Sequence, residues 1–299
     1  MKSPLVSIII LNHNARDFLS ATLDSIASQQ GIKTEVIVVD NDSTDGSAAM
    51  VKKDYPAVKW VQRDTSVGFS AGNNVGIKHA SGDTILFLNP DASFTQSSDL
   101  KMCYDKLWGT KGLGALTARV NLVASGGIDE TCHRGFPTPW AGLTHFSGLS
   151  KLFPKLPIFN QYTKRYLGYE TEHEIDAIGG MFFLIKREVG ERVGWWDEDY
   201  PFYGDDLDFC YRLKQAGFSN YYYPGVTVMH YKGISSGMGR HTKQISTANI
   251  ATRQQARMWS IQAMEIFYRK HYASKYPVLL NWLVYLGIKL LRFRRLTLA

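Results

Sequence analysis

Hydrophobic and polar positions follow two alternating periods along the first 120 residues. Short apolar runs typical of buried strands occur at 6–11, 35–39, 58–62 and 84–88. Between them, apolar residues recur every three or four positions, as on one face of a helix, at 16–29, after 43 and at 70–80. Strands that alternate with helices indicate crossover connections. The pattern therefore predicts an α/β fold whose mainly parallel sheet is flanked by helices.

The pattern changes after residue 120. Residues 121–175 are rich in Pro, Gly and aromatic side chains and show little periodicity, so we expect a long insertion and not a separate domain. Alternation then resumes, with an apolar strand, a helix, a strand and long C-terminal helices at 177–186, 205–216, 226–229 and beyond 240. We predict one α/β domain over 1–239, followed by a helical segment over 240–299.

Composition places the chain among ordinary folded proteins. It has 299 residues, 44% of them hydrophobic and 20% charged, which is enough to build a sizeable core. The three cysteines, Cys103, Cys132 and Cys210, form no C-x-x-C pair, which favours reduced thiols over a disulfide framework or a zinc site. The apolar run at the N-terminus is too short for a signal peptide. These features predict a cytoplasmic protein.

Positive charge is concentrated at the C-terminus. From Arg240 onward, eleven Lys or Arg residues face one acid, Glu265, whereas the rest of the chain is slightly acidic. Residues 276–296 combine leucines and aromatics with basic side chains, but their apolar part is too short to span a bilayer. We interpret this helix as lying on an anionic membrane surface, with a packing or oligomerisation helix as the alternative. The basic residues do not alternate with aromatics on a sheet, so nucleic-acid binding is not expected.

Polar side chains follow three of the predicted strands. Asn12 and Asn14 follow the first, Asp40 ends the second, and Asn89 and Asp91 follow the fourth. Ligands of open parallel sheets bind beyond the carboxyl ends of the strands, so we expect a binding site at this edge. No G-x-G-x-x-G or Walker loop is present to hold phosphates with backbone groups. The sequence therefore predicts a divalent cation, held by Asp91, that neutralises a diphosphate.

Four stretches carry a resemblance to a known family. They read VSIIILNHN, VIVVDNDSTDGS, VGFSAGNNVGIKHASGDTILFLNPD and YGDDLDFCYRLKQAG, in this order from about residue 5 to residue 217. Together they resemble the family-2 inverting glycosyltransferases of the GT-A fold. Two further stretches, VMHYKGISS and YRKHY, are similar to bacterial rhamnosyltransferases that extend lipid-linked oligosaccharides.

This resemblance implies roles for residues of the donor site. Asp40 would lie beside a uracil or thymine base, whose N3–H a carboxylate can accept. Asn73 and Asn74 match residues that line the donor pocket. Asn89-Pro90-Asp91 stands in place of the D-x-D motif, so Asp91 is the main carboxylate ligand of Mg²⁺ or Mn²⁺.

The resemblance also implies a second metal ligand and a base. His230 matches a histidine that completes the metal site, and Ser235 just beyond it is expected to hydrogen-bond a phosphate. Asp206 matches the base that removes the proton of the acceptor hydroxyl, with Asp205 as a supporting acid. Trp195 and Trp196 precede this cluster. They either stack on an acceptor sugar or belong to the core.

The sequence thus predicts an inverting, metal-dependent glycosyltransferase. Its donor would be a nucleoside diphosphate sugar, first dTDP-L-rhamnose, with a UDP-hexose or UDP-galactofuranose as the alternative. Its acceptor would be a saccharide hydroxyl, lipid-linked at the inner face of the plasma membrane, in cell-surface polysaccharide assembly. The contrasting hypothesis is a non-catalytic protein that binds nucleotide sugars, but the intact GDDLD cluster argues against it.

Overall fold

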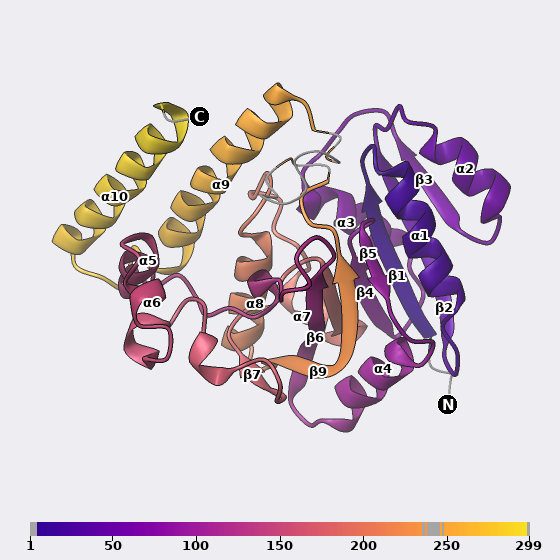
Figure 1. Cartoon of the computed structure of the whole chain (residues 1–299), viewed down its shortest axis with the longest axis horizontal. Helices are drawn as coiled ribbons and strands as arrows, with labels where there is room; N and C mark the ends of the chain where they lie inside the picture. The colour runs from indigo at the N-terminus through magenta and orange to yellow at the C-terminus, as the bar shows by residue number, and fades with distance from the viewer. Residues whose placement is uncertain (1–4, 235–236, 238–245, 247, 298–299) are drawn as a thin grey trace.

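The computed structural model describes residues 5–234, 237, 246 and 248–297. One nine-stranded sheet forms its centre, with the order β3-β2-β1-β4-β8-β6-β9-β5 and with β7 paired to β9 (Figure 1). The strands are β1 (Leu5–Asn12), β2 (Lys33–Asn41), β3 (Lys59–Arg63), β4 (Thr84–Leu88), β5 (Ala92–Phe94), β6 (Leu113–Leu122), β7 (His173–Ile175), β8 (Phe182–Lys186) and β9 (Ser219–His230).

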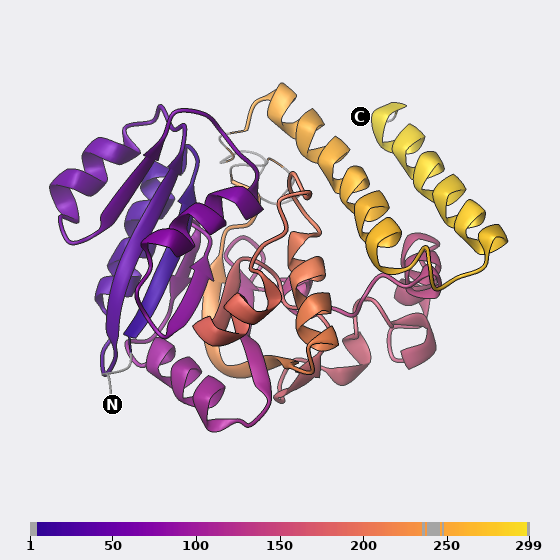
Figure 2. The ribbon, with the colours of Figure 1, turned by 180° about the vertical axis from the view of Figure 1, so that it is seen from behind.

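Helices cover the sheet and extend beyond one end of it (Figures 1 and 2). The α-helices are α1 (Arg16–Ala27), α2 (Ser47–Asp54), α3 (Phe69–His79), α4 (Asp99–Gly109), α5 (Pro139–Phe146), α6 (Leu149–Leu152), α7 (Arg187–Val193), α8 (Asp205–Gln215), α9 (Ile250–His271) and α10 (Val278–Thr297). Short 3₁₀ helices are η1 (Glu130–Cys132), η2 (Pro157–Phe159) and η3 (Arg165–Leu167).

The predicted α/β fold is confirmed. Strands β3, β2, β1 and β4 run parallel, and β8 enters antiparallel between β4 and β6. Helix α2 follows Gly46, whose φ of 84° suits a residue without a Cβ. One strand boundary differs from expectation. The strand predicted from residue 177 begins only at Phe182, because Ala177 forms an isolated bridge with Arg134 instead and Gly180 and Met181 line the cavity described below.

Strand register brings the polar strand ends together. Asn12 pairs with Asp40, and Asp40 with Gln62, at the carboxyl ends of β1, β2 and β3. The short strand β5 pairs antiparallel with β9, and Ala92 lies opposite His230. Asp91 is therefore held next to His230, although 138 residues separate Ala92 from its partner in the chain.

The two C-terminal helices form a hairpin at the end of the molecule opposite β3 (Figures 1 and 2). The Tyr268 hydroxyl of α9 donates to Asn281 Oδ1 of α10 at 2.7 Å. Helix α9 also packs on the loop before α8, where a Cβ on Gly204 would lie 3.0 Å from the Ala263 Cβ. The predicted domain boundary near 239 lies in a stretch outside the described residues. Within the described part of the chain, no helix is both long and apolar enough to span a bilayer.

Candidate active site

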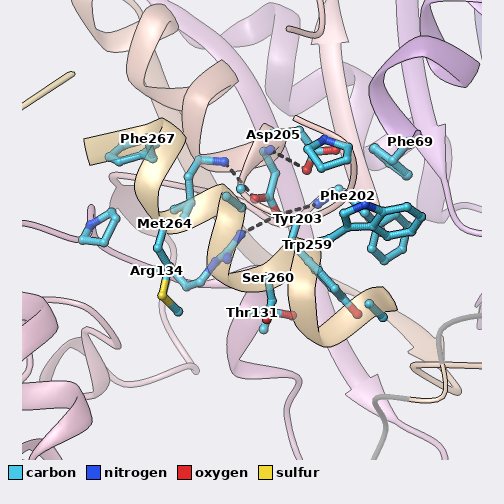
Figure 3. Close-up of a pocket in the computed structure, with 18 of the residues that line it drawn as sticks. Phe69, Thr131, Arg134, Phe202, Tyr203, Asp205, Trp259, Ser260, Met264 and Phe267 are labelled. Atoms are coloured by element: carbon cyan, nitrogen blue, oxygen red, sulfur yellow. Dashed lines mark hydrogen bonds and ion pairs between the residues drawn. The ribbon is translucent and has the colours of Figure 1, made fainter. Parts of the chain in front are cut away.

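A large cavity joins the strand ends to the C-terminal helices. Its volume is about 1450 Å³, and its walls come from β1, the turn after β4, the insertion, the start of α8, the end of β9, α9 and α10. Figure 3 shows Arg134 of the insertion, Asp205 of α8 and Ser260, Met264 and Phe267 of α9 around this space. Of the predicted site residues, the cavity brings together Asn89, Asp91, Asp205, Asp206 and His230.

Asp91 and His230 form a buried pair in this cavity. His230 Nε2 lies 3.3 Å from Asp91 Oδ1, and both side chains are almost fully buried. The turn that carries Asp91 is anchored, because the Thr22 hydroxyl of α1 donates to the Pro90 carbonyl at 2.8 Å. Asn89 Nδ2 approaches the same His230 nitrogen at 3.3 Å. Asn89 and Asp91 from the turn after β4 therefore face the same nitrogen of His230 at the end of β9.

The other imidazole nitrogen is held by a residue that the sequence reasoning missed. Asp129 of the insertion is fully buried, and its Oδ2 lies 3.1 Å from His230 Nδ1. Its Oδ1 accepts from Lys232 Nζ at 2.5 Å. Burial alone would lower the pKa of His230, but the Asp91 and Asp129 carboxylates outweigh it and raise this pKa to about 9. His230 and Lys232 hold the pKa of Asp129 far below its usual range, although burial alone would raise it.

The pair fits a divalent cation. Two ligands at right angles, each about 2.1 Å from a Mg²⁺, lie about 3 Å apart, close to the 3.3 Å between Asp91 Oδ1 and His230 Nε2. A carboxylate on the far nitrogen is the usual partner of a metal-binding histidine. Among the described residues, no cluster of three or more His, Cys, Asp or Glu side chains is arranged around a cation position. A cation here would take its remaining ligands from phosphate oxygens and water.

Two adjacent carboxylates stand at the N-terminus of α8, opposite this pair. Gly204, with a φ of 76°, turns the chain into the helix. Asp206 faces the cavity and pairs with Arg134 Nη2 at 2.5 Å, while its second oxygen accepts the Leu207 N–H. The Gly180 N–H also donates to this carboxylate at 3.3 Å. A carboxylate has about four acceptor sites, so about one remains for a substrate hydroxyl. Arg134 is the second site residue that the sequence reasoning missed, because it lies in the aperiodic insertion.

Asp205 has a different environment from its neighbour. Its side chain is buried, and one oxygen accepts from the Ser70 hydroxyl at 3.3 Å. Burial and the Asp206 carboxylate raise the pKa of Asp205 to about 7. Two carboxylates with different environments are typical of sites in which one keeps a negative charge. Asp208, on the same helix, pairs with Arg212 and His271 at 2.7 Å each and therefore has a structural role.

Asn12 and Asp40, at the ends of β1 and β2, form a hydrogen bond with one another and do not line the cavity. Asp40 is buried, and it accepts hydrogen bonds from Asn12 Nδ2 at 3.0 Å and Gln62 Nε2 at 2.9 Å. Asn14 Oδ1 accepts the Thr44 N–H at 2.8 Å. None of Asn12, Asn14 and Asp40 lines the cavity in the described structure, so a contact between Asp40 and a base stays a prediction.

The remaining predicted residues also support the walls from behind. Asn73 donates to the Phe69 carbonyl, and Asn74 donates to the Trp196 carbonyl, each at 2.9 Å. Trp196 is buried and makes edge-on contacts with Phe87 and other rings, while Trp195 packs against Gly190. Both tryptophans therefore pack in the core, as the second of the two interpretations predicts. Ser235 lies outside the described residues.

Curated relatives share most of the chain. An N-acetylglucosaminyl-diphospho-decaprenol L-rhamnosyltransferase of Mycobacterium tuberculosis is 24% identical over 246 residues, which cover 78% of each chain. The rhamnosyltransferase WbbL of Escherichia coli K12 is 26% identical over 238 residues, covering 76% of this chain and 83% of WbbL.

Solved structures share the fold. A mannosyltransferase of Pyrobaculum calidifontis, in complex with GDP-mannose and Mn²⁺, superposes with a TM-score of 0.53 at 19% identity and covers 97% of this chain and 81% of its own. The structure of GalNAc-T7 with UDP, GalNAc and Mn²⁺ gives a TM-score of 0.57 at 14% identity, over 91% of this chain and 58% of that one. These similarities identify the GT-A fold.

The sequence profile described as "Glycosyl transferase family 2" matches residues 7–190, which carry β1 to β8 and the Asp91 turn. This match covers more than half of the chain and agrees with the fold and with the enzymatic relatives. The chain therefore belongs to glycosyl transferase family 2 and is a glycosyltransferase.

Proposed function

We propose that this protein transfers L-rhamnose from dTDP-L-rhamnose to a hydroxyl of a lipid-linked saccharide, with inversion at the anomeric carbon. One observation carries the proposal: the Asp91–His230 pair and the Asp206 carboxylate face the same cavity from separate elements. The similarity to two rhamnosyltransferases supports the choice of sugar. The mycobacterial relative is named for a diphospho-decaprenol acceptor, which supports a polyprenyl diphosphate acceptor here.

Asp91 and His230 would hold the divalent cation. A bound Mg²⁺ or Mn²⁺ would supply positive charge that stabilises the leaving diphosphate. Asn89 lies within reach of the same point, since its amide is 3.3 Å from His230 Nε2. The chain's own contribution is to orient His230 through Asp129, because a hydrogen bond at Nδ1 leaves Nε2 available as a ligand.

Asp206 would act as the base. The acceptor oxygen forms a bond to the anomeric carbon of the sugar, and the bond from that carbon to the diphosphate oxygen breaks. The hydroxyl proton passes to the Asp206 carboxylate, and the nucleoside diphosphate leaves with the bonding electron pair. Arg134 supports this role because its guanidinium, 2.5 Å from the carboxylate, holds the Asp206 side chain in place at the cavity. Attack from the side opposite the leaving group gives inversion.

We also place the protein at the inner face of the plasma membrane. Helix α10 exposes a row of large apolar side chains together with Lys289, Arg292 and Arg294. Such a helix suits an anionic bilayer surface, where each basic residue contributes roughly 1 kcal/mol.

A donor screen tests the proposed function. Purified protein is titrated with dTDP-L-rhamnose, UDP-glucose and UDP-galactofuranose in the presence of Mn²⁺, and the product anomer is determined by NMR. We expect dTDP-L-rhamnose to bind most tightly and to give the inverted product, and EDTA to stop turnover. A retained anomeric configuration, or full turnover in EDTA, would contradict the mechanism; preferential use of a UDP-sugar would correct the donor.

A further inference from the structure

The cavity continues away from the strand ends into a groove with apolar walls. Residues at helical spacing on one face of α10 form one wall, and α5 forms the other with Gly142, Leu143 and Phe146. The α10 face consists of Leu280, Leu283, Val284, Gly287, Ile288, Leu291 and Arg295. At the mouth, Leu143 and Leu283 remain 59% and 50% exposed. A large exposed apolar surface of this kind marks a binding groove or a membrane contact.

Two basic side chains lie within this apolar groove. Arg295 is half-buried, and it donates to the Ser260 hydroxyl at 2.7 Å. Burial lowers the pKa of Arg295, and no carboxylate pairs with it among the described residues. His145 of α5 lines the same space, and its buried Nδ1 has no hydrogen-bond partner within the part of the chain that the structure describes. Burying a cation without an anionic partner is unfavourable, so Arg295 points to an anionic ligand, and the His145 imidazole in the same groove can hydrogen-bond to it.

Contacts of α9 relate this groove to the Asp205–Asp206 pair. Ser260, which accepts from Arg295, precedes Ala263 by about one helical turn, roughly 5 Å along α9. Ala263 lies against Gly204, directly before the Asp205–Asp206 pair. An anion at Arg295 would therefore lie about one turn of α9 from the level of that pair. The apolar wall runs from Arg295 toward the start of α10, because Tyr268 of α9 contacts Asn281 and Tyr285 of α10.

We propose that the groove between α5 and α10 binds the polyprenyl diphosphate of the acceptor, with its diphosphate at Arg295 and His145 and its hydrocarbon chain along Leu283 and Gly287. The inference rests on the proposed function for the identity of the acceptor. Its chemistry accounts for both halves of the site, since an unpaired cation suits a diphosphate and a leucine-rich groove suits an isoprenoid chain. The exposed apolar face of α10 next to the groove would let the chain enter from a bilayer.

Direct binding of geranylgeranyl diphosphate to the full chain tests the site. Calorimetry is run with this probe, with inorganic diphosphate and with geranylgeraniol. We expect the complete probe to bind at least about tenfold more tightly than either part, because both halves of the site contribute. Equal binding of inorganic diphosphate and the complete probe would overturn the proposal.

Matched variants test each half of the site. Arg295→Gln should weaken binding about tenfold or more, since a charged hydrogen bond is lost. Arg269→Gln removes the same charge from an exposed position of α9 and should change the affinity less than about twofold. Gly287→Leu places a side chain in the groove, where an added Cβ meets no atom within 4 Å, and it should also abolish tight binding. Gly287→Ala is its control for the change in helix propensity.

Wild-type affinity in Gly287→Leu, or in a folded Arg295→Gln, would contradict the site. Detection of a homodimer by sedimentation, together with no binding of the probe, would also contradict the site. Nucleotide-sugar affinity is measured on the same samples to separate the two proposals. A protein that binds the nucleotide sugar and not the probe lacks the lipid site but keeps the proposed function. A protein that binds only the probe keeps the lipid site and lacks the proposed function.

Discussion

Replacing Asp129 with Asn should weaken Mn²⁺ binding, although Asp129 acts through His230 and not as a ligand of the metal. Asp129 Oδ2 accepts a hydrogen bond from His230 Nδ1 at 3.1 Å, which leaves Nε2 facing Asp91 without a proton when a cation binds. In the Asp129→Asn variant, the side-chain carbonyl oxygen can still accept from Lys232 and from the Thr131 N–H, as Asp129 Oδ1 does now. The amide nitrogen of the new side chain would then face His230 Nδ1.

Two N–H donors cannot share that contact, so His230 must change its tautomer. With Nδ1 as the acceptor, the proton moves to Nε2, and the nitrogen that faces Asp91 can no longer bind a cation. Loss of such an orienting partner typically costs about 10- to 100-fold in metal affinity. That range corresponds to about 1.4 to 2.7 kcal/mol. We expect the effect of Asp129→Asn to lie within it.

Mn²⁺ titration followed by the EPR signal of free Mn²⁺ measures this affinity directly, without donor or acceptor. Glu130→Gln is the matched control, since it removes one negative charge from the adjacent position, where Glu130 pairs with Arg165 instead. His230→Gln removes the ligand and sets the lower limit. If Asp129→Asn binds Mn²⁺ within twofold of the wild type while His230→Gln does not bind it, the orienting role of Asp129 is refuted. If the wild type binds no Mn²⁺, the metal site itself is refuted.

Three further predictions concern the base, its neighbour and the basic helix. Asp206→Asn should lower turnover about 100- to 10,000-fold with donor affinity unchanged; near-normal turnover would exclude it as the base. The pKa of Asp205 is raised to about 7 in the folded state, so the folded protein binds more protons than the unfolded chain between about pH 4 and pH 7. The free energy of unfolding should therefore fall as pH rises through this range, by up to about 1.4 kcal/mol per pH unit from this group. Asp205→Asn should therefore raise the melting temperature more at pH 8 than at pH 4, and an equal shift at both would contradict the burial argument. Changing Lys289, Arg292 and Arg294 together to Gln should weaken binding to vesicles containing phosphatidylserine by about 3 kcal/mol at low salt; unchanged binding would show that the helix does not bind membranes by charge.

The local pattern of the sequence determined the N-terminal half of the fold. The predicted strand at 84–88 matches the observed β4, because a short, continuous apolar run that ends at Asn89-Pro90 favours a strand buried on both faces. The polar residues that end these strands were equally readable, because the carboxyl ends of parallel strands meet at one edge. Asp91 and His230 were placed by this rule together with the family resemblance, and the register of β5 on β9 brings them to 3.3 Å.

Tertiary structure alone decided which residues complete the site. Asp129 and Arg134 lie in an insertion without periodicity, and no local pattern connects them to His230 and Asp206, which follow 101 and 72 residues later. Long-range packing also separated the polar strand ends into two groups: Asp40 became a buried brace, whereas Asp91 lines the cavity. The pairing of α9 with α10 made the second face of the basic helix a wall of that cavity. Sequence periodicity reports which face of an element is apolar, but only the packed chain specifies what that face covers.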